Sequence, residues 1–302
     1  MGTLRFTVAE AEAGSRLDSL LATRDEIASR ARAEKLLATD AVRVDGEVRA
    51  KSHRLEGGAL VEVELPEPEG GLVPERASVR VLYEDPHLLV VDKPAGIAVH
   101  PGAGERRPTL AGQLLALGAR GGADPERPGI VHRLDRDTSG ALVASRSAGA
   151  YAALQEAIRR REVERRYLAL VRGRPRSRSG RIDAPIGRDR RAPTRRSLDT
   201  AEPRDAVTRF EVRETLAQHA LLEVSLETGR THQIRVHLAA IGLPVSGDRQ
   251  YGVKGDLGLE RQFLHAYRLR FRHPVTREDV DVVSPLPDDL QEALERARRL
   301  EA

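Results

Sequence analysis

The residues best suited to chemistry in this 302-residue chain lie at 129–140, Gly-Ile-Val-His-Arg-Leu-Asp-Arg-Asp-Thr-Ser-Gly. Two carboxylates, Asp135 and Asp137, follow a β-branched Ile-Val pair, and an apolar run at 141–144 comes next. We expect two buried strands here, at 130–131 and 141–144, joined by a loop that carries both carboxylates. A carboxylate held in such a loop can act as a nucleophile or as an acid or base.

Two other interpretations of this loop are open. Asp-x-Asp-Thr after a strand is similar to the nucleophile loop of aspartate-based phosphotransferases, which would predict magnesium dependence. A salt-bridged turn without chemistry is the second, because arginines flank both carboxylates. A calcium-binding EF-hand loop is excluded, since the twelfth position must be Glu and is Arg146 here.

A second polar segment, 230–237, reads Arg-Thr-His-Gln-Ile-Arg-Val-His. Arg230 lies in a predicted turn, where its guanidinium can hold a carboxylate through a two-pronged contact; a structural or phosphate-contacting arginine is the alternative. We expect Thr231 to cap the helix that follows. His232 and His237 are too far apart in register to share one helix face as zinc-binding histidines do. With no cysteine in the chain either, we expect no metal site.

Basic residues are concentrated in one stretch of the chain. Between Arg159 and Arg196 there are 15 arginines and four acidic residues, whereas the net charge of the whole chain is +4. Such clustering is typical of a surface that binds a polyanion, most simply nucleic acid. No apolar run approaches the ~20 residues that a membrane helix needs, and the N-terminus lacks a signal-peptide core. We expect a soluble, cytoplasmic protein without a membrane segment.

The predicted strands outnumber the predicted helices and do not alternate regularly with them. Strands are expected at 79–83, 88–91, 167–171, 206–213, 220–227, 263–271 and 280–283, and helices at 109–117, 148–158, 231–241 and 287–300. This order favours an α+β domain with a mixed, mostly antiparallel sheet.

The chain is predicted to begin with a small module at 1–66, followed by a Pro- and Gly-rich linker at 67–76 and a large domain at 77–302. An Arg-Leu-Asp start, a Ser-Arg-x-Arg helix and a Val-x-Val-Asp-Gly turn resemble the αL RNA-binding module named after a ribosomal protein of the small subunit.

Charge does not mark this module as an RNA binder, because it holds 10 basic and 12 acidic residues. Any RNA contact must come from one helix face with Arg30, Arg32 and Lys35, or from Arg43. On charge alone, a protein-contacting accessory domain is the alternative.

Three segments of the large domain occur together and in order. His-Arg-Leu-Asp-x-Asp-Thr-Ser-Gly (132–140), Arg-Arg-Tyr-Leu-Ala-Leu-Val (165–171) and Leu-Glu-Thr-Gly-Arg-Thr-His-Gln-Ile-Arg-Val-His (226–237) resemble the RluA-like family of RNA pseudouridine synthases. Val-Val-Asp-Lys-Pro-Ala-Gly (90–96) and Gly-Asp-Arg-Gln-Tyr-Gly (247–252) fit the same family.

The resemblance implies an isomerase that needs no metal, redox group or nucleotide cofactor. It implies that Asp135 is the nucleophile, that Arg230 pairs with it, and that Tyr167 stacks against the target uracil. Arg133 is similar to the family arginine that helps to displace the target base. We also expect Arg165 and Arg166, which directly precede this tyrosine, to contact RNA.

The implied substrate is large-subunit ribosomal RNA, with the target base flipped out of its helix, and we expect the protein to be a monomer. Asp137 is expected to fix the loop and not to act as a second catalyst. A hypothesis from another class is a non-catalytic RNA-binding ribosome-assembly factor on the same scaffold. The Asp-Tyr-Arg set argues against it, because a pure binder has no need of a buried, paired carboxylate.

Overall fold

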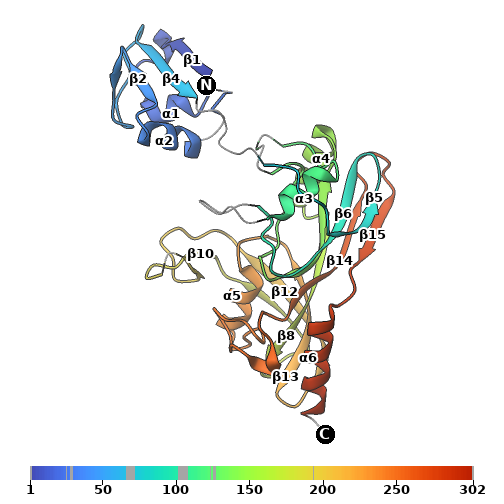
Figure 1. The fold of residues 1–302 in the computed structure, drawn as a ribbon. Helices are drawn as coiled ribbons and strands as arrows, with labels where there is room; N and C mark the ends of the chain where they lie inside the picture. The colour runs from blue at the N-terminus through green and yellow to red at the C-terminus, as the bar shows by residue number, and fades with distance from the viewer. Residues whose placement is uncertain are drawn as a thin grey trace. The chain divides into compact units, whose positions relative to one another are not determined.

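The computed structural model describes residues 2–24, 26–27, 30–65, 72–100, 108–122, 124, 127–192 and 194–300. The chain divides into two compact units, Met1–Gly71 and Leu72–Ala302. Figure 1 shows the elements of each. Of the expected linker, residues 67–71 lie outside the described ranges, and residues 72–76 form neither helix nor strand.

The first unit is a small four-stranded antiparallel sheet with two short helices, and its strand order is β1-β4-β2-β3. Its elements are β1 (Gly2–Thr7), the 3-10 turn η1 (Glu10–Glu12), α1 (Leu17–Leu21), α2 (Arg30–Ala38), β2 (Val42–Val44), β3 (Glu47–Val48) and β4 (Leu60–Leu65). Apolar residues of both helices and of β2 and β4, among them Leu17, Leu21 and Val61, form a core of its own.

The second unit is built on one nine-stranded sheet with the order β5-β6-β7-β14-β8-β13-β12-β9, in which β15 also pairs with β14. Its strands are β5 (Arg80–Glu84), β6 (Leu88–Lys93), β7 (Ser139–Ser145), β8 (Glu164–Arg172), β9 (Ser179–Asp183), β12 (Val207–Thr215), β13 (His219–Leu226), β14 (Leu264–Arg272) and β15 (Asp279–Val283). Strands β7 and β14 run parallel, and the other described pairs of this sheet are antiparallel. The predicted α+β class with a mixed, mostly antiparallel sheet is confirmed.

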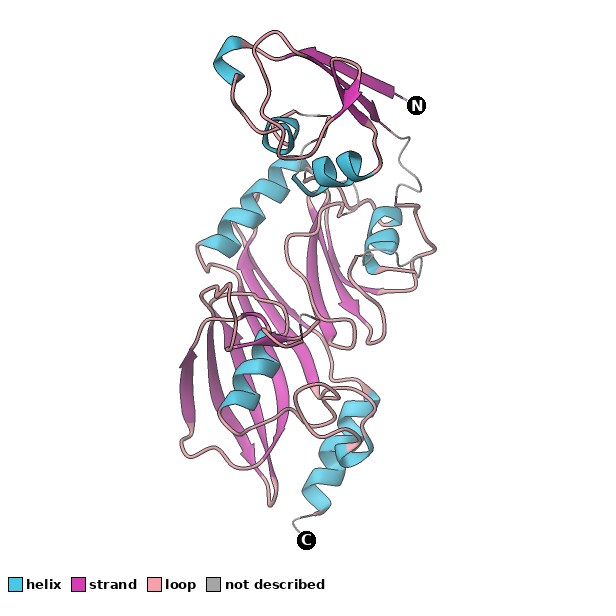
Figure 2. Ribbon diagram, turned by 90° about the vertical axis from the view of Figure 1, so that its left-hand side faces the viewer, coloured by secondary structure: helices cyan, strands magenta, loops and turns pink. Residues whose placement is uncertain are grey.

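Four helices and a separate hairpin complete the described part of this unit (Figure 2). The helices are α3 (Leu110–Ala116), α4 (Ala148–Arg159), α5 (Gln233–Ala240) and α6 (Asp288–Arg299), and a 3-10 turn, η2, covers Asp256–Gly258. The hairpin consists of β10 (Gly187–Arg188) and β11 (Arg196–Ser197) and lies outside the large sheet. No helix in the described ranges is long and apolar enough to cross a membrane.

Local signals explain where several elements begin. The hydroxyl of Ser147 accepts a hydrogen bond from the amide of Ala150 at 3.2 Å, which caps α4 as its position predicts. Thr109 caps α3 in the same way. Strands β6 and β7 pair with each other and contain fully buried apolar residues such as Leu89 and Leu142.

The segment that precedes the loop with the two carboxylates differs from the prediction. Ile130 forms only an isolated bridge with Ala144, so the predicted strand at 130–131 is wrong. The imidazole of His132 accepts a hydrogen bond from the amide of Val143 at 3.1 Å, and so takes the β7 donor that a longer strand would use. The loop therefore leaves the sheet early, and β7 begins at Ser139.

The exit from this loop is fixed by close approach of β7 to β14. Gly140 has φ +119°, and a Cβ there would lie 2.3 Å from the carbonyl oxygen of Ala266, so only glycine fits. Beside it the hydroxyl of Ser139 contacts His265 Nδ1 at 2.9 Å, and His265 Nε2 contacts the carbonyl of Ser284 at 3.1 Å. This buried network locks the parallel pair that ends the loop.

Candidate active site

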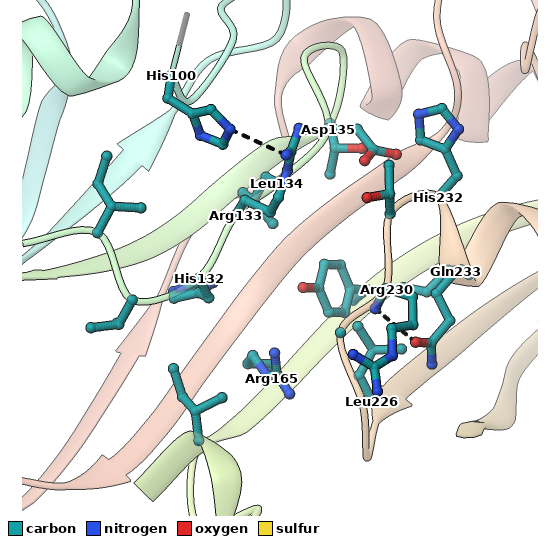
Figure 3. Close-up of a pocket in the computed structure, with 18 of the residues that line it drawn as sticks. His100, His132, Arg133, Leu134, Asp135, Arg165, Leu226, Arg230, His232 and Gln233 are labelled. Carbon is teal, nitrogen blue, oxygen red and sulfur yellow. Dashed lines mark hydrogen bonds between the residues drawn. The ribbon is translucent and has the colours of Figure 1, made fainter. Parts of the chain in front are cut away.

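A pocket of about 500 Å³ lies in the second unit, where three segments meet. The loop from Ile130 to Asp135, the strand β8 and the turn before α5 all contribute lining residues. Figure 3 shows that side chains from these segments converge on one space. The pocket thus lies among the segments that the sequence marked out for chemistry.

Asp135 is held in this pocket by an arginine of α5. Arg235 Nη1 donates to Asp135 Oδ2 at 3.1 Å, and its Nε and Nη2 donate to the two oxygens of Asp248 at 2.7 and 2.9 Å. The side chain of Asp248 is fully buried, whereas that of Asp135 is 17% exposed. Asp248 therefore fixes the guanidinium, and the guanidinium presents Asp135 to the pocket.

The electrostatics of this group favour its charged form. Burial alone would lower the pKa of Arg235, but the hydrogen bonds and charges of Asp248 and Asp135 outweigh it and raise that pKa. Burial would raise the pKa of Asp248, but the arginine and two backbone amides, those of Gln250 and Tyr251, bring that pKa below its usual range. The arginine is therefore a permanent cation between two carboxylates.

The expected pairing of Arg230 with Asp135 is corrected by this geometry. Arg230 lines the same pocket, but its Nε donates to the carbonyl of Asp205 at 3.0 Å, and its amide donates to Gln233 Oε1 at 2.9 Å. The chain passes through a left-handed residue, His232 (φ 58°), before the helix begins at Gln233. The first arginine thus stays in the turn, and Arg235, in the first turn of the helix, reaches the carboxylate.

The predicted cap of α5 is wrong for the same reason. His232 occupies the N-cap position, not Thr231, and its side chain makes no capping hydrogen bond. The side chain of Gln233 holds the turn before α5 instead. Its amide oxygen accepts hydrogen bonds from the hydroxyl of Thr228 and from the backbone amide of Arg230.

Strand β8 delivers Tyr167 and Arg165 to the pocket and keeps Arg166 away from it. Side chains alternate along a strand, so the first two share one face. Both line the pocket and are 5% and 7% exposed. Arg166 is not among the pocket residues and instead forms ion pairs with Glu164 and Glu223.

Arg133 lies at the mouth of the pocket. Its Nη1 contacts His100 Nε2 at 3.2 Å, an interaction that Figure 3 marks. Burial, together with the charge of Arg133, lowers the pKa of His100 to about 4, so the imidazole is neutral and can accept this hydrogen bond. Arg133 itself is exposed and therefore accessible to a ligand.

Asp137, the second carboxylate of the loop, is not among the residues that line the pocket. Its oxygen accepts from Arg136 Nε at 3.3 Å, and its carbonyl accepts from Arg261 at 3.2 Å. In the N-terminal unit, α2 includes Arg30, Arg32 and Lys35, but their side chains lie outside what the structure describes.

Lys93 also helps to hold the loop of Asp135, a role that the sequence pattern did not indicate. It is fully buried, and its Nζ donates to the carbonyls of Pro94, Ile97 and Arg136 at 2.8, 2.8 and 2.9 Å. Burial lowers the pKa of this lysine to about 7, against the charges of the loop carboxylates. It ties the residue after Asp135 to a neighbouring turn and so fixes the loop.

Arg235 and Asp248 are the main residues that the sequence analysis missed. Both lie in segments that it singled out, but no local periodicity identifies which arginine of 230–237 turns inward. No group of three or more histidine or acidic side chains in the described ranges is arranged to hold a metal ion. The site offers the oriented carboxylate of Asp135, the ring of Tyr167 and several cations.

Known proteins share this combination of fold and sequence. Residues 87–240 match the RNA pseudouridylate synthase family. An uncharacterized RNA pseudouridine synthase of Mycobacterium tuberculosis (strain CDC 1551 / Oshkosh) is 43% identical over 307 residues, which cover 99% of each chain. The ribosomal large subunit pseudouridine synthase D of Xanthomonas campestris pv. campestris is 41% identical, covering 96% of this chain and 91% of that protein.

Among solved structures, that of human RNA Pseudouridylate Synthase Domain Containing 1 is similar with a TM-score of 0.56 at 29% identity. The match covers 73% of this chain and 86% of the human chain. Family match, full-length relatives and fold therefore agree, and this chain belongs to the RNA pseudouridine synthase family.

Proposed function

We propose that Asp135 is the nucleophile with which this RNA pseudouridine synthase isomerises uridine. The reaction breaks the bond from N1 of uracil to C1′ of ribose and forms a bond from C5 to C1′. The proton on C5 is released to solvent, and N1 takes up a proton, so atoms and electrons balance. One oriented carboxylate suits this chemistry, because it can attack and later leave.

The observation that carries the proposal is the contact of 3.1 Å between Arg235 and Asp135 inside the pocket. A nucleophile has to stay ionised and fixed in direction, and a guanidinium that is itself clamped by Asp248 serves both needs. The remaining exposure of Asp135, 17% of its side chain, leaves the carboxylate accessible to a substrate.

The pocket also favours a uridine that has left its helix. Tyr167 and Arg165 lie deep in the pocket and are almost fully buried, so a base within a duplex cannot reach them. In this proposal the target nucleotide flips into the pocket, its uracil stacks on Tyr167, and Arg133 helps to displace it. Arg230 and Arg165 supply positive charge to the nucleotide.

For the substrate, we propose large-subunit ribosomal RNA. The relative from Xanthomonas campestris is named as a synthase of this class and is 41% identical over nearly its full length. The N-terminal unit then serves as a second RNA contact through α2, and the protein acts as a monomer in the cytoplasm. An oligomer seen by light scattering would contradict the monomeric state.

Asp135→Asn tests the proposal, with Asp137→Asn as the matched control from the same loop. Uridine labelled with tritium at C5 loses the label to water when the bond to C5 forms, so tritium release from labelled ribosomal RNA measures turnover. We expect Asp135→Asn to release no tritium while it binds RNA as tightly as the wild type. We expect the control to retain most activity. Release by Asp135→Asn at a rate near that of the wild type would show that another group is the nucleophile.

A further inference from the structure

The arginine-rich hairpin β10–β11 carries positive charges that are not all balanced by ion pairs with carboxylates of the described residues. Arg188 and Arg196 are direct partners across the two strands. Like charges in that position repel each other unless an anion lies between or above them. No carboxylate of the described residues forms an ion pair with either side chain, so the hairpin is suited to a phosphate backbone.

The charge of this hairpin reaches residues that line the pocket. The charge of Arg196 acts on both Arg133 and His232, which line the pocket. A strand of RNA whose target nucleotide enters the pocket therefore passes positive side chains on the hairpin.

One residue, Tyr251, connects the hairpin with the active site. Its phenol oxygen accepts a hydrogen bond from the amide of Arg196 at 2.9 Å. The same oxygen lies 2.9 Å from His232 Nδ1. Burial lowers the pKa of His232, which keeps its imidazole neutral, so the phenol can donate to Nδ1 while it accepts from the hairpin.

The ring of Tyr251 makes a second connection. The guanidinium carbons of Arg195 and Arg235 lie 5.2 and 5.1 Å from the centre of the ring. The first arginine belongs to the hairpin, and the second holds Asp135. Arg195 is also tied to this segment because its Nη2 donates to the carbonyl of Gln250 at 2.7 Å.

Tyr251 is rigidly placed between these partners. Its amide donates to Asp248 Oδ1 at 3.1 Å, and that oxygen also accepts from Arg235. His232, which the phenol contacts, has the left-handed backbone at the start of α5 and lies on the same side of the pocket as Asp135 (Figure 3). Tyr251 therefore connects the hairpin with His232 and with Arg235, the partner of Asp135.

We propose that Tyr251 is a positioning residue, through which RNA bound to the β10–β11 hairpin aligns His232 and Arg235 and so orients Asp135. The inference rests on the proposed function of the pocket, which it deepens by adding a sensor for the flanking RNA. Phosphates on Arg188 and Arg196 remove the repulsion between them and hold the hairpin in place. The phenol and the ring of Tyr251 then transmit that position to the carboxylate.

The variants Tyr251→Phe and Arg188→Gln/Arg196→Gln separate the two ends of this connection. The first removes the phenol bonds and retains the ring between the arginines. The second removes the hairpin charges but retains the amide of residue 196 that contacts the phenol. Tyr83→Phe is the matched control. Tyr83 lies on β5 and does not line the pocket, and its phenol donates a hydrogen bond to Asp85 at 2.8 Å.

Single-turnover rates at saturating RNA form the main test. We expect Tyr251→Phe and the hairpin variant each to lower the rate constant about ten-fold, because misplacing a reacting group is costly even when binding is complete. We expect the triple variant to be no slower than Tyr251→Phe, since the connection is already broken. Multiplying effects, or a hairpin variant that reaches the wild-type rate at saturation, would overturn the proposal.

Two measurements do not depend on turnover. Loss of two phosphate contacts should reduce the slope of log K against log salt concentration by about 1.4 for single-stranded RNA, and an unchanged slope would show that the hairpin does not bind RNA. Oligoadenylate, which supplies phosphates but no uridine, should shift the imidazole ¹⁵N resonances of His232 in the wild type. It should shift them neither in Tyr251→Phe nor in the hairpin variant, and equal shifts in all three would refute the coupling.

If the wild type released no tritium from any uridine-containing RNA, the proposed function would fail, but the response of His232 to oligoadenylate would still test the connection. If the wild type is active and the effects of the two variants multiply, the function stands and the coupling falls.

Discussion

Replacing Arg235 by Met should strongly destabilise the fold. The guanidinium is held by both oxygens of Asp248, whose side chain is fully buried. Without it, a buried carboxylate is left with no cation, and breaking such a pair costs about 4 kcal/mol of unfolding free energy. Asp135 also loses its contact at 3.1 Å, so turnover should be lost as well.

The pH dependence of that loss follows from Asp248. Its folded pKa is lowered in the wild type, although burial alone would raise it, because Arg235 and two backbone amides favour the charged form. A carboxyl with a lowered pKa stabilises the fold above its unfolded pKa of about 3.9 and loses that contribution as pH falls. In Arg235→Met burial dominates, so the carboxyl takes up a proton at higher pH. The gap in stability between wild type and variant should therefore be largest near neutral pH and narrow toward acid.

Urea unfolding at a series of pH values measures this gap, and two further variants control it. Arg235→Met with Asp248→Asn removes both charges and keeps an acceptor for the amides of Gln250 and Tyr251, so it should recover a good part of the lost stability. Arg230→Ala should cost less than about 1 kcal/mol, because this arginine is exposed. A stability gap that does not change with pH, or an equal loss of stability in Arg230→Ala, would refute the conclusion that Arg235 is the arginine that pairs with Asp248 and Asp135.

Three other changes have defined outcomes. Tyr167→Phe should retain more single-turnover activity than Tyr167→Leu, since only the former keeps the ring for stacking; equal losses would argue against stacking. Lys93→Met leaves three carbonyls without their donor and should lower the unfolding free energy by about 3 kcal/mol, as urea unfolding measures; an unchanged midpoint would contradict its role in the loop. Arg133→Ala should slow turnover on duplex RNA more than on a single-stranded substrate, and an equal effect on both would argue against a role in displacing the base.

Elements with strong local signals were predictable from the sequence. The helix predicted at 148–158 and the strands predicted at 263–271 and 280–283 are confirmed as α4, β14 and β15, and Ser147 caps the helix. Such signals depend on neighbours in the chain, which the sequence contains. The strand predicted at 130–131 was wrong because the imidazole of His132 takes the place of a backbone partner.

The centre of the site could be predicted only in part. The sequence indicated the carboxylate Asp135, and the structure places it in the pocket. It did not indicate which arginine reaches this carboxylate, because that depends on the left-handed backbone of His232 and on Asp248, which lies in a different segment. The role inferred for Tyr251 has no local signal either, since it arises only where the hairpin and α5 meet.

A map of pseudouridines in large-subunit ribosomal RNA from cells that lack this protein tests the proposed activity most directly. We expect one or more sites to lose pseudouridine, and we expect the wild-type gene and the Asp137→Asn gene to restore them. Asp135→Asn, made to the same level, should restore none. An unchanged map in the deletion strain would contradict large-subunit ribosomal RNA as the substrate, and restoration by Asp135→Asn would contradict Asp135 as the nucleophile.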